Sequence, residues 1–324
     1  MSRRLPPTAR RVLEKGDLCH LAVSTRNGPH LTPVVYVLDG GRLWITTARS
    51  SVKARAWRED KRVAGLVQAG DLAVTFRGRV RTYDALDPLS WPAAAVAGPR
   101  LVSAATRFSL KNARFFAGYA VDARRVPFAW SPPGRLFCGI EFMAGRVLNA
   151  DTGDVLDGWG EWPTGVRYQP AYQPLGRTRP LDRRVPAEVR AAVGRAGTGA
   201  LAFQSRDLVS VLPVAWRRES AAGAYEATLP ARFVRLAHPP GRSTAALTIN
   251  HASRWRAAEM AGMVLQGSAE LFSPTRARKG GARLRGALEE GWRGLGWADP
   301  VLVRLRPLRV VWWRGWTSGT VRSS

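Results

Sequence analysis

Residues that bind metals or form disulfides are scarce in this chain. Its 324 residues include two cysteines, Cys19 and Cys138, and four histidines. Two cysteines cannot build a disulfide framework, and no Cys or His pair has the spacing of a metal site. We therefore expect a reducing compartment and no bound metal.

Long apolar runs are also missing. Nowhere do about 18 apolar residues follow one another, so no membrane span is expected. The opening segment, MSRRLPPTARRVLEKG, is positively charged but has no apolar stretch behind it, so it does not predict a secretion signal. The expectation is a cytoplasmic protein with no membrane partner.

Acidic residues are few beside the basic ones. The chain has 50 Lys and Arg against 24 Asp and Glu, a net charge of +26. Both halves are basic, and arginine is spread almost evenly while lysine is scarce. We interpret most of this charge as a general preference for arginine. Nucleic acid is the less favoured partner, and it stays open as an alternative because clustered basic residues attract phosphate.

The familiar catalytic side-chain sets cannot be found either. The sequence shows no paired carboxylates, no Ser-His-Asp set and no activated cysteine. His20, His238 and His251 suggest no role, and His30, just before Pro33, is the histidine of most interest, although a lone histidine is more often structural. No catalytic residue can be named, which is compatible with chemistry performed by a bound cofactor.

What the chain does contain is an internal repeat. LAVSTRNGPHLTPVVY (21–36) aligns with LAFQSRDLVSVLPVAW (201–216) with five identities and no gap, and both indicate a hairpin. The further aligned pairs are 43–68 with 225–250, 74–84 with 263–273, where Gly78 lies opposite Gly267, and 136–142 with 301–307. Each half is expected to fold in the same way.

The order of elements predicts a mainly β protein with a few helices. Short strands at hairpin spacing favour a closed barrel in each half, with helices at 101–121 and 275–295. We place the first barrel at residues 1–148 and the second, diverged one at 186–324. A connector rich in Gly, Pro and Trp, residues 149–185, is expected to lie across one of the barrels.

The segment ITTARSSVKARAW (45–57) indicates an anion site. A strand would end at Thr47 and a helix capped by Ser51 would follow, leaving the first backbone N–H groups of the helix without partners. Such groups bind phosphate, with Thr46 and Thr47 adding hydroxyls and Lys53 adding charge. The absence of a Gly-rich loop favours a single phosphate. The alternative is an ordinary Ser cap with Lys53 in solvent.

Residues 17–84 resemble the pyridoxamine 5'-phosphate oxidase-like, FMN-binding split-barrel family. The motifs GPHLTPV, LWITT, SxKAR and DKRVA follow one another in the order typical of that family, and the second half looks like a diverged copy. The resemblance implies two tandem split β-barrels that form an intrachain pseudo-dimer. A monomer would then do what two chains do elsewhere, with FMN in the cleft between the barrels.

The same resemblance implies a set of cofactor-binding residues. Thr46, Thr47, Ser51 and Lys53 would hold the phosphate, and the strand of Pro33, Val34, Val35 and Tyr36 would lie along the isoalloxazine ring. Trp312, Trp313 and Trp316 of the second half could cap the ring or belong to a core. Arg49 and Arg55 flank the phosphate site, although solvent exposure is the favoured interpretation for both.

The second half departs from the pattern at its own phosphate site. Phe233 stands opposite Ser51, and Arg235 stands opposite Lys53. Pro239 would end the helix there after about two turns. At most one of the two equivalent sites is therefore expected to bind.

The leading hypothesis is a flavin-dependent oxidoreductase that binds one FMN and acts on a small organic molecule. One alternative is a deazaflavin-dependent reductase of the same fold. Another is a non-catalytic binding protein with a degenerate cleft, whose basic surface binds nucleic acid or an acidic partner in a salt-sensitive way. The substrate and the direction of the reaction stay open.

Overall fold

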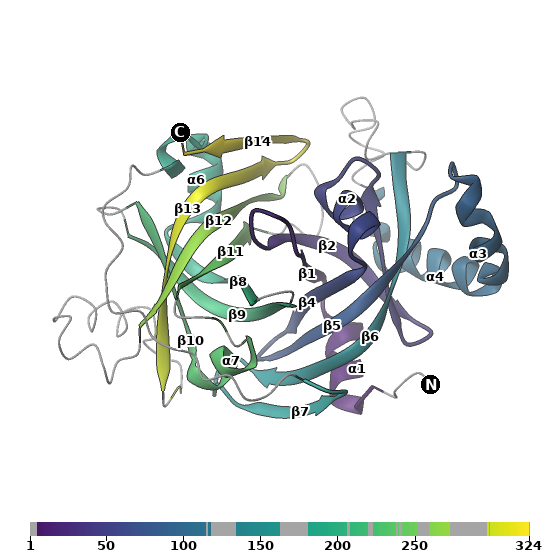
Figure 1. Cartoon of the computed structure of the whole chain (residues 1–324), viewed down its shortest axis with the longest axis horizontal. Helices are drawn as coiled ribbons and strands as arrows, with labels where there is room; N and C mark the ends of the chain where they lie inside the picture. Colours follow the sequence, from purple (N-terminus) through teal and green to yellow (C-terminus); the bar gives the residue numbers. More distant parts are fainter. Residues whose placement is uncertain are drawn as a thin grey trace.

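The computed structural model describes residues 5–114, 116–117, 134–162, 181–205, 208–219, 223–237, 239, 242–251, 259–272, 297 and 299–323. Two antiparallel sheets lie side by side, one in each half of the chain (Figure 1). No helix in these residues is both long and apolar enough to cross a bilayer.

The first sheet is built from residues 18–159. Its strands are β1 (Leu18–Val23), β2 (His30–Asp39), β3 (Arg42–Ala48), β4 (Arg62–Ala69), β5 (Leu72–Tyr83), β6 (Arg135–Asn149) and β7 (Val155–Trp159). The described helices of this half are α1 (Pro7–Lys15), α2 (Val52–Glu59), α3 (Trp91–Val96) and α4 (Gly98–Lys111), with a 3-10 turn, η1 (Pro88–Ser90), before α3.

The second sheet repeats the first. Its strands are β8 (Ala196–Ser205), β9 (Leu208–Glu219), β10 (Ala224–Pro230), β11 (Arg242–His251), β12 (Ala261–Phe272), β13 (Pro300–Arg314) and β14 (Thr317–Arg322). The described helical elements of this half are η4 (Leu181–Arg184), α6 (Ala187–Val193) and α7 (Ala231–Ala237).

The two sheets have the same strand order. The first runs β3-β2-β1-β4-β5-β6-β7 and also pairs β3 with β6, and the second runs β10-β9-β8-β11-β12-β13-β14 and also pairs β10 with β13. Each extra pairing closes six strands into a barrel and leaves β7 or β14 at the edge. The prediction of a mainly β fold with two tandem barrels is confirmed.

The equivalence of the halves extends to single residues. Thr47 faces Leu136 across β3 and β6, and Leu229 faces Val301 across β10 and β13, as the sequence alignment requires. Backbone bonds repeat as well: Arg49 N donates to Gly134 O, and Ala231 N donates to Asp299 O. Contacts between the barrels are reciprocal as well, because Thr75 Oγ1 donates to Val211 O and Thr248 Oγ1 donates to Leu31 O, the position equivalent to Val211. The halves therefore have a pseudo-twofold relation that matches residues of one cleft with residues of the other.

Both barrels carry a β-bulge at the same place. The pairing shifts register between Arg77 and Gly78 on β5 and between Gln266 and Gly267 on β12. A Cβ added to Gly78 would lie 2.5 Å from the carbonyl oxygen of Glu141, and one added to Gly267 would lie only 1.7 Å from a carbonyl oxygen of β13. Glycine is needed at both positions because the backbones approach so closely.

Helices close and cover the first barrel. The buried side chains of α1 belong to the core of that barrel, and α4 packs on Trp44 and Phe137 along its flank. Of the predicted helix at 101–121, α4 confirms the first part, and residues 118–121 lie outside the described residues. The helix predicted at 275–295 falls wholly outside them.

The two barrels pack against each other through a shared apolar core. Ala22, Leu31 and Leu66 of the first barrel belong to the core cluster of the second. Buried polar bonds also cross the interface: Thr75 Oγ1 donates to Val211 O at 2.7 Å, and Gln266 Nε2 donates to Pro29 O at 2.8 Å. These contacts fix the orientation of one barrel relative to the other and so fix the shape of any cleft between them.

The expected connector contains ordered structure. Its residues 155–159 form β7, which pairs with β6, and Trp159 packs in the first core. Residues 163–180 lie outside the described part of the chain. The division at residues 148 and 185 stays a prediction.

Candidate functional site

A cavity of about 310 Å³ lies where the first barrel meets the β13–β14 hairpin of the second. The first barrel contributes both polar and apolar residues, and the second contributes the large apolar side chains of Met260 and two tryptophans beside Thr317 and Ser318. The lining includes Thr46, Thr47, Ser51, Lys53 and Arg135 on one side and Met260, Trp313 and Trp316 on the other. A volume near 300 Å³ is at the lower end of small-molecule sites.

The N-terminus of α2 opens onto this cavity. Ser51 is the N-cap, and its Oγ accepts a hydrogen bond from Ala54 N at 3.1 Å and lies 3.0 Å from Thr47 Oγ1. The predicted helix start at Ser51 is confirmed. The N–H groups of Val52 and Lys53 begin the helix and have no partner inside it, so this end favours an anion.

Lys53 is buried at the cavity wall. Its side chain is only 7% exposed, and Nζ donates to Thr32 Oγ1 at 2.6 Å. The alternative of an ordinary cap with Lys53 in solvent is wrong. Burial, together with the positive charge of Arg135, lowers the pKa of Lys53 from 10.5 to about 8.

Arg135 is a site residue that the sequence did not reveal. It begins β6 opposite Ala48, and its guanidinium donates to Thr46 Oγ1 at 2.8 Å and to Thr46 O at 3.1 Å. In the sequence it precedes the strand LFCGIEF, but nothing local distinguishes it from the many other arginines. Only the pairing of β3 with β6 brings it to the end of the strand that carries Thr46.

The electrostatics of the cavity favour a bound anion. Lys53 and Arg135 raise the potential there, and the described lining residues include no Asp or Glu. An anion between the two cations would offset their repulsion and restore the pKa of Lys53 toward its ordinary value.

The strand predicted to face the ring divides into two parts. Pro33, Val34 and Val35 line the cavity, but Tyr36 does not. Tyr36 is completely buried in the barrel, where its hydroxyl donates to Leu13 O at 2.8 Å and Lys111 Nζ lies 3.9 Å from its ring centroid. Tyr36 belongs to the core of the first barrel, so the interior of the barrel takes its ring.

Two of the three predicted tryptophans reach the cavity. Trp313 and Trp316 line it from the β13–β14 hairpin. Trp312 packs instead against its cross-strand neighbour Gly319, whose added Cβ would lie 2.6 Å from the indole. The second barrel therefore supplies an aromatic wall, as the tandem arrangement predicts.

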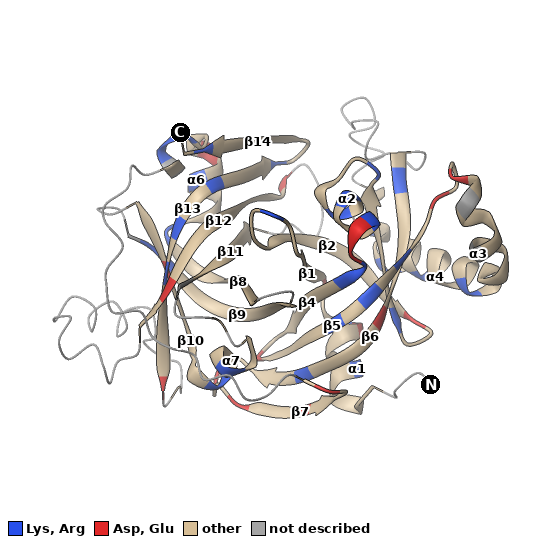
Figure 2. Ribbon diagram, in the orientation of Figure 1, with Lys and Arg blue, Asp and Glu red and all other residues tan. Residues whose placement is uncertain are grey.

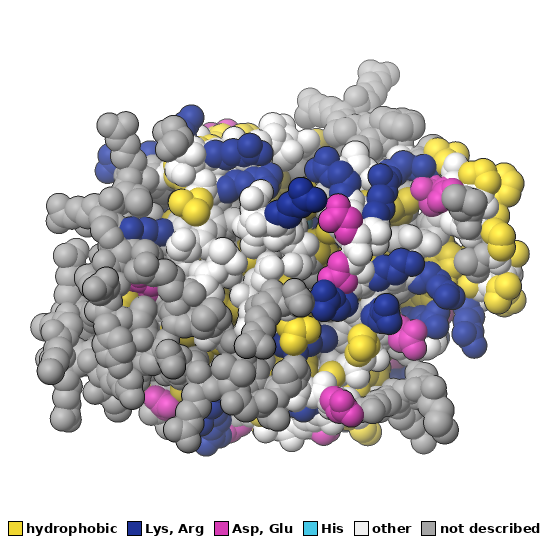
Figure 3. All heavy atoms as spheres, in the orientation of Figure 1, with side chains coloured by type: hydrophobic (Ala, Val, Ile, Leu, Met, Phe, Trp, Pro, Cys, Tyr) yellow, Lys and Arg dark blue, Asp and Glu magenta, His cyan; other side chains and the backbone are white. Residues whose placement is uncertain are grey.

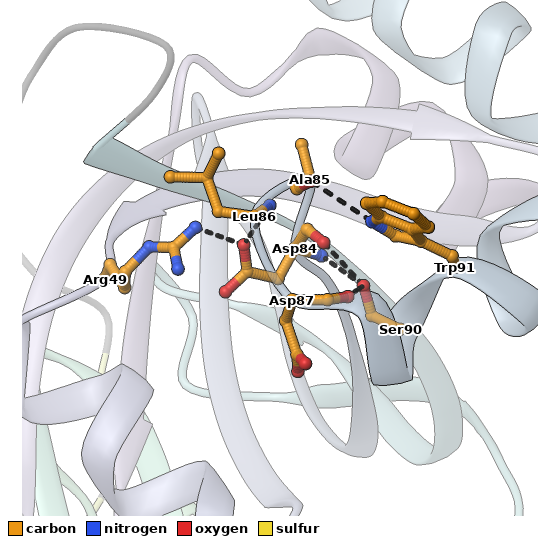
Figure 4. Close-up of polar contacts among 7 residues, drawn as sticks. All are labelled: Arg49, Asp84, Ala85, Leu86, Asp87, Ser90 and Trp91. Atoms are coloured by element: carbon orange, nitrogen blue, oxygen red, sulfur yellow. Dashed lines mark hydrogen bonds and ion pairs between the residues drawn. The ribbon is translucent and has the colours of Figure 1, made fainter.

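The flanking arginines have different environments. Arg55 is exposed, as expected. Arg49 is half-buried and forms an ion pair with Asp84, which also accepts a hydrogen bond from Leu86 N (Figure 4). Ser90 ties the same turn together by donating to Asp84 O. Arg49 thus holds the turn that leads into α3, and it does not line the cavity.

The described histidines and the two cysteines take no part in the cavity lining. His20 Nε2 lies 2.9 Å from Asn250 Oδ1, and His251 is exposed. His30 is buried, which lowers its pKa to about 3, with Lys53 adding to the effect. His238 lies outside the described residues.

Both thiols are buried within the first barrel. Burial raises the pKa of each, and that of Cys138 reaches about 12. Neither is an activated nucleophile. Among the described residues no group of His, Cys, Asp and Glu could hold a metal ion.

Three of the five matching positions of the second barrel have lost their polar groups, whereas Thr228 matches Thr46 and Arg235 matches Lys53. Leu229 stands where the first barrel has Thr47, Phe233 where it has Ser51, and Pro300 where it has Arg135. Leu229 and Phe233 are completely buried. Helix α7 ends at Ala237, before Pro239, as predicted.

Outside the cavity, the charge is spread over the surface. Lys and Arg occur on strands of both barrels (Figure 2). On the face shown in Figure 3, acidic side chains lie between the basic ones over the first barrel. A mixed surface of this kind gives weaker attraction for a polyanion than a continuous basic stripe would.

The buried Lys53 predicts how stability depends on pH. Between pH about 8 and 10.5 the unfolded chain keeps the proton on Lys53 and the folded chain loses it, so the free energy of unfolding should rise with pH across this window. Lys53→Met should remove this contribution, up to about 3 kcal/mol. Denaturant titrations of both proteins at pH 7.5 and 10 check it. The pKa of Lys111 is also lowered to about 8, but its contribution to the pH dependence is the same in both proteins and cancels when the two are compared. Equal pH dependence in the two proteins would contradict the burial of a charged Lys53.

Comparison with known proteins agrees with the fold. A model of the pyridoxamine 5'-phosphate oxidase family matches residues 6–97, which include β1 to β5 and α2. No curated protein gives a significant match.

Several solved structures resemble part of the chain. One is a FAD-binding protein from Mesorhizobium loti, with 16% identity and a TM-score of 0.31, and the match covers 44% of this chain and 94% of that one. Another is an F420 reductase, with 19% identity and a TM-score of 0.29, and the match covers 44% of this chain and 98% of that one. A third is General Stress Protein 26 from Bacillus anthracis, with 11% identity and a TM-score of 0.29, and the match covers 43% of this chain and 89% of that one. Residues 6–97 of the first barrel thus match the pyridoxamine 5'-phosphate oxidase family, and the second barrel repeats the strand order of the first.

Proposed function

We propose that the chain is a flavin-dependent oxidoreductase that binds one FMN in the cavity between its barrels and acts on a small organic molecule. The observation that carries the proposal is the pairing of Lys53 and Arg135 with the N-terminus of α2 on one wall and Trp313 and Trp316 on the other. A phosphate monoester joined to a flat ring would place its negative charge at the basic wall and its ring at the aromatic wall.

The donor set suits a phosphate monoester. Thr46, Thr47 and Ser51 supply hydroxyls, and Lys53 and Arg135 supply charge. Arginine and lysine bind phosphate oxygens through charge-assisted hydrogen bonds, and a helix N-terminus adds backbone donors. Binding would draw Lys53 from Thr32 toward the anion, at little cost because the two groups share the same wall.

The remaining lining suits a flat, mostly apolar ring. Pro33, Val34 and Val35 form one side, and Trp313 and Trp316 form another. The isoalloxazine of FMN supplies the electron-transfer chemistry when it is bound. The chain's own contribution would be to orient the ring, exclude water with the aromatic wall and leave an opening for the substrate. Because the cofactor would supply the chemistry, the chain needs no set of catalytic side chains of its own.

The visible absorption spectrum of the purified protein tests the proposal. We expect either bound flavin or, after FMN is added to the colourless protein and the excess removed, a flavin band that remains with the protein. A preparation that stays colourless after reconstitution would contradict flavin binding.

The same cavity could accept the phosphorylated side chain of a deazaflavin. Parallel titrations with FMN and with F420, followed by fluorescence, distinguish the two cofactors, and the proposal predicts the tighter affinity for FMN. A protein that binds neither cofactor but shifts DNA at physiological salt would instead support the non-catalytic binding protein, because phosphate contacts weaken strongly as salt rises.

A further inference from the structure

The pseudo-twofold relation defines a second cleft, opposite the first. Gly315, which lines the cavity, corresponds to Ala150, because Gly315 N donates to Met260 O at 2.8 Å and Ala150 N donates to Asp71 O at 2.7 Å at matching turns. In the same way Ala48, another lining residue, corresponds to Pro230. The second cleft therefore lies between Ala150 and Pro230.

An indole fills this space. Trp297 is only 6% exposed, and its Nε1 donates to the carbonyl oxygen of Ala150 at 2.7 Å. A Cβ added to Gly153 would lie 3.2 Å from Trp297 Cδ1 and 2.7 Å from Pro230 Cγ. The ring and the turn around Gly153 thus occupy the region that stays open in the first cleft.

The turn that closes over this region is longer than its counterpart. Residues 150–154 connect β6 to β7, whereas only Gly315 and Trp316 connect β13 to β14. Asp154 at the end of the longer turn forms an ion pair with Arg232 of α7. Trp162 then donates to Leu236 O of the same helix at 2.7 Å. Both contacts join the first half of the chain to the second and hold the cleft shut.

We propose that the second cleft is a latent binding site for a flat aromatic molecule with an N–H donor, and that Trp297 is its built-in ligand. The proposal rests on the pseudo-twofold relation and does not depend on flavin binding in the first cleft. Because Leu229, Phe233 and Pro300 replace Thr47, Ser51 and Arg135, the site has lost most of its phosphate-binding groups and suits a neutral ring better than a nucleotide. Arg235, which matches Lys53, donates to Ala231 O of its own helix. The first cleft is then open to a ligand, whereas the second is filled by Trp297 and stabilises the contact between the barrels.

Trp297→Gly with added indole tests the proposal. The variant should melt about 10 °C or more below the wild type, because removing a buried tryptophan leaves a large cavity. Millimolar indole should recover part of that loss, and benzofuran, which has the same shape but no N–H, should recover less. The wild type with the same additives serves as the control and accounts for any binding in the first cavity. FMN stoichiometry should be the same in both proteins, so this result is separate from the proposed function.

Two results would overturn the proposal. One is a Trp297→Gly protein as stable as the wild type, and the other is a destabilised variant that indole does not protect more than benzofuran. If Trp297→Gly yields no folded protein, Trp297→Phe decides the question. It keeps a ring but leaves the Ala150 carbonyl without its donor, so it should be less stable than the wild type, and equal stability would contradict the assigned recognition.

Discussion

Replacing Lys53 by methionine will weaken FMN binding by about 10- to 100-fold, because a hydrogen bond to a charged group contributes about 1.5–3 kcal/mol. The same change should raise the melting temperature of the protein without cofactor. Lys53 is buried beside Arg135, and its lowered pKa shows that the fold holds this charge at a cost. Methionine has a similar length and fills the space without that charge.

This pair of opposite effects is difficult to obtain from a purely structural lysine. A residue that only supports the fold would lose stability and affinity together when replaced. Affinity is measured by quenching of flavin fluorescence at pH 7, and stability by thermal unfolding without FMN.

Arg55→Met is the matched control, since Arg55 lies on the same helix and is exposed. It should change neither quantity appreciably. Arg135→Met should weaken binding in the same range as Lys53→Met. If Lys53→Met binds FMN as tightly as the wild type, the phosphate is not held at this wall.

Gly267 lies at the β-bulge of β12. Gly267→Ala should lower the free energy of unfolding by about 3 kcal/mol or more, at or above the usual cost of overpacking. The added Cβ would lie 1.7 Å from the carbonyl oxygen of Arg306, and a backbone atom cannot move aside as the end of a side chain can. Gly78→Ala at the equivalent bulge should act in the same direction, with a contact of 2.5 Å.

Gly98→Ala provides the control for these glycine variants. A Cβ added to Gly98 would meet no described atom within 4 Å, and Gly98 begins α4, where alanine is tolerated. Its free energy of unfolding should stay within about 0.5 kcal/mol of the wild-type value. Urea titrations of the three variants measure the differences. Equal stability of Gly267→Ala and Gly98→Ala would contradict the close approach at the bulge.

Much of the fold could be predicted because the chain repeats itself. The ungapped match of 21–36 with 201–216 and the pairing of Gly78 with Gly267 both survive in the structure as equivalent hairpins and equivalent bulges. Local signals were also reliable at Ser51, which caps α2, and at Pro239, which α7 stops before. These features depend on neighbours in sequence or on a duplicated pattern.

The parts of the site that were missed depend on contacts between distant residues. Arg135 reaches Thr46 only because β6 returns to pair with β3, a separation of 89 residues that includes α3 and α4. Tyr36 was expected along the ring, but the closure of the barrel and the position of α1 draw its hydroxyl to Leu13. Trp297 had no local signal, since its role follows from the turn at Ala150 in the other half of the chain.

A crystal structure of the chain grown with FMN would locate the cofactor. We expect one FMN per chain, with its phosphate between Lys53 and Arg135 at the start of α2 and its ring against Trp313 or Trp316. The second cleft should still hold Trp297. An FMN whose phosphate lies away from Lys53 and Arg135, or one bound in the second cleft in place of Trp297, would contradict the account.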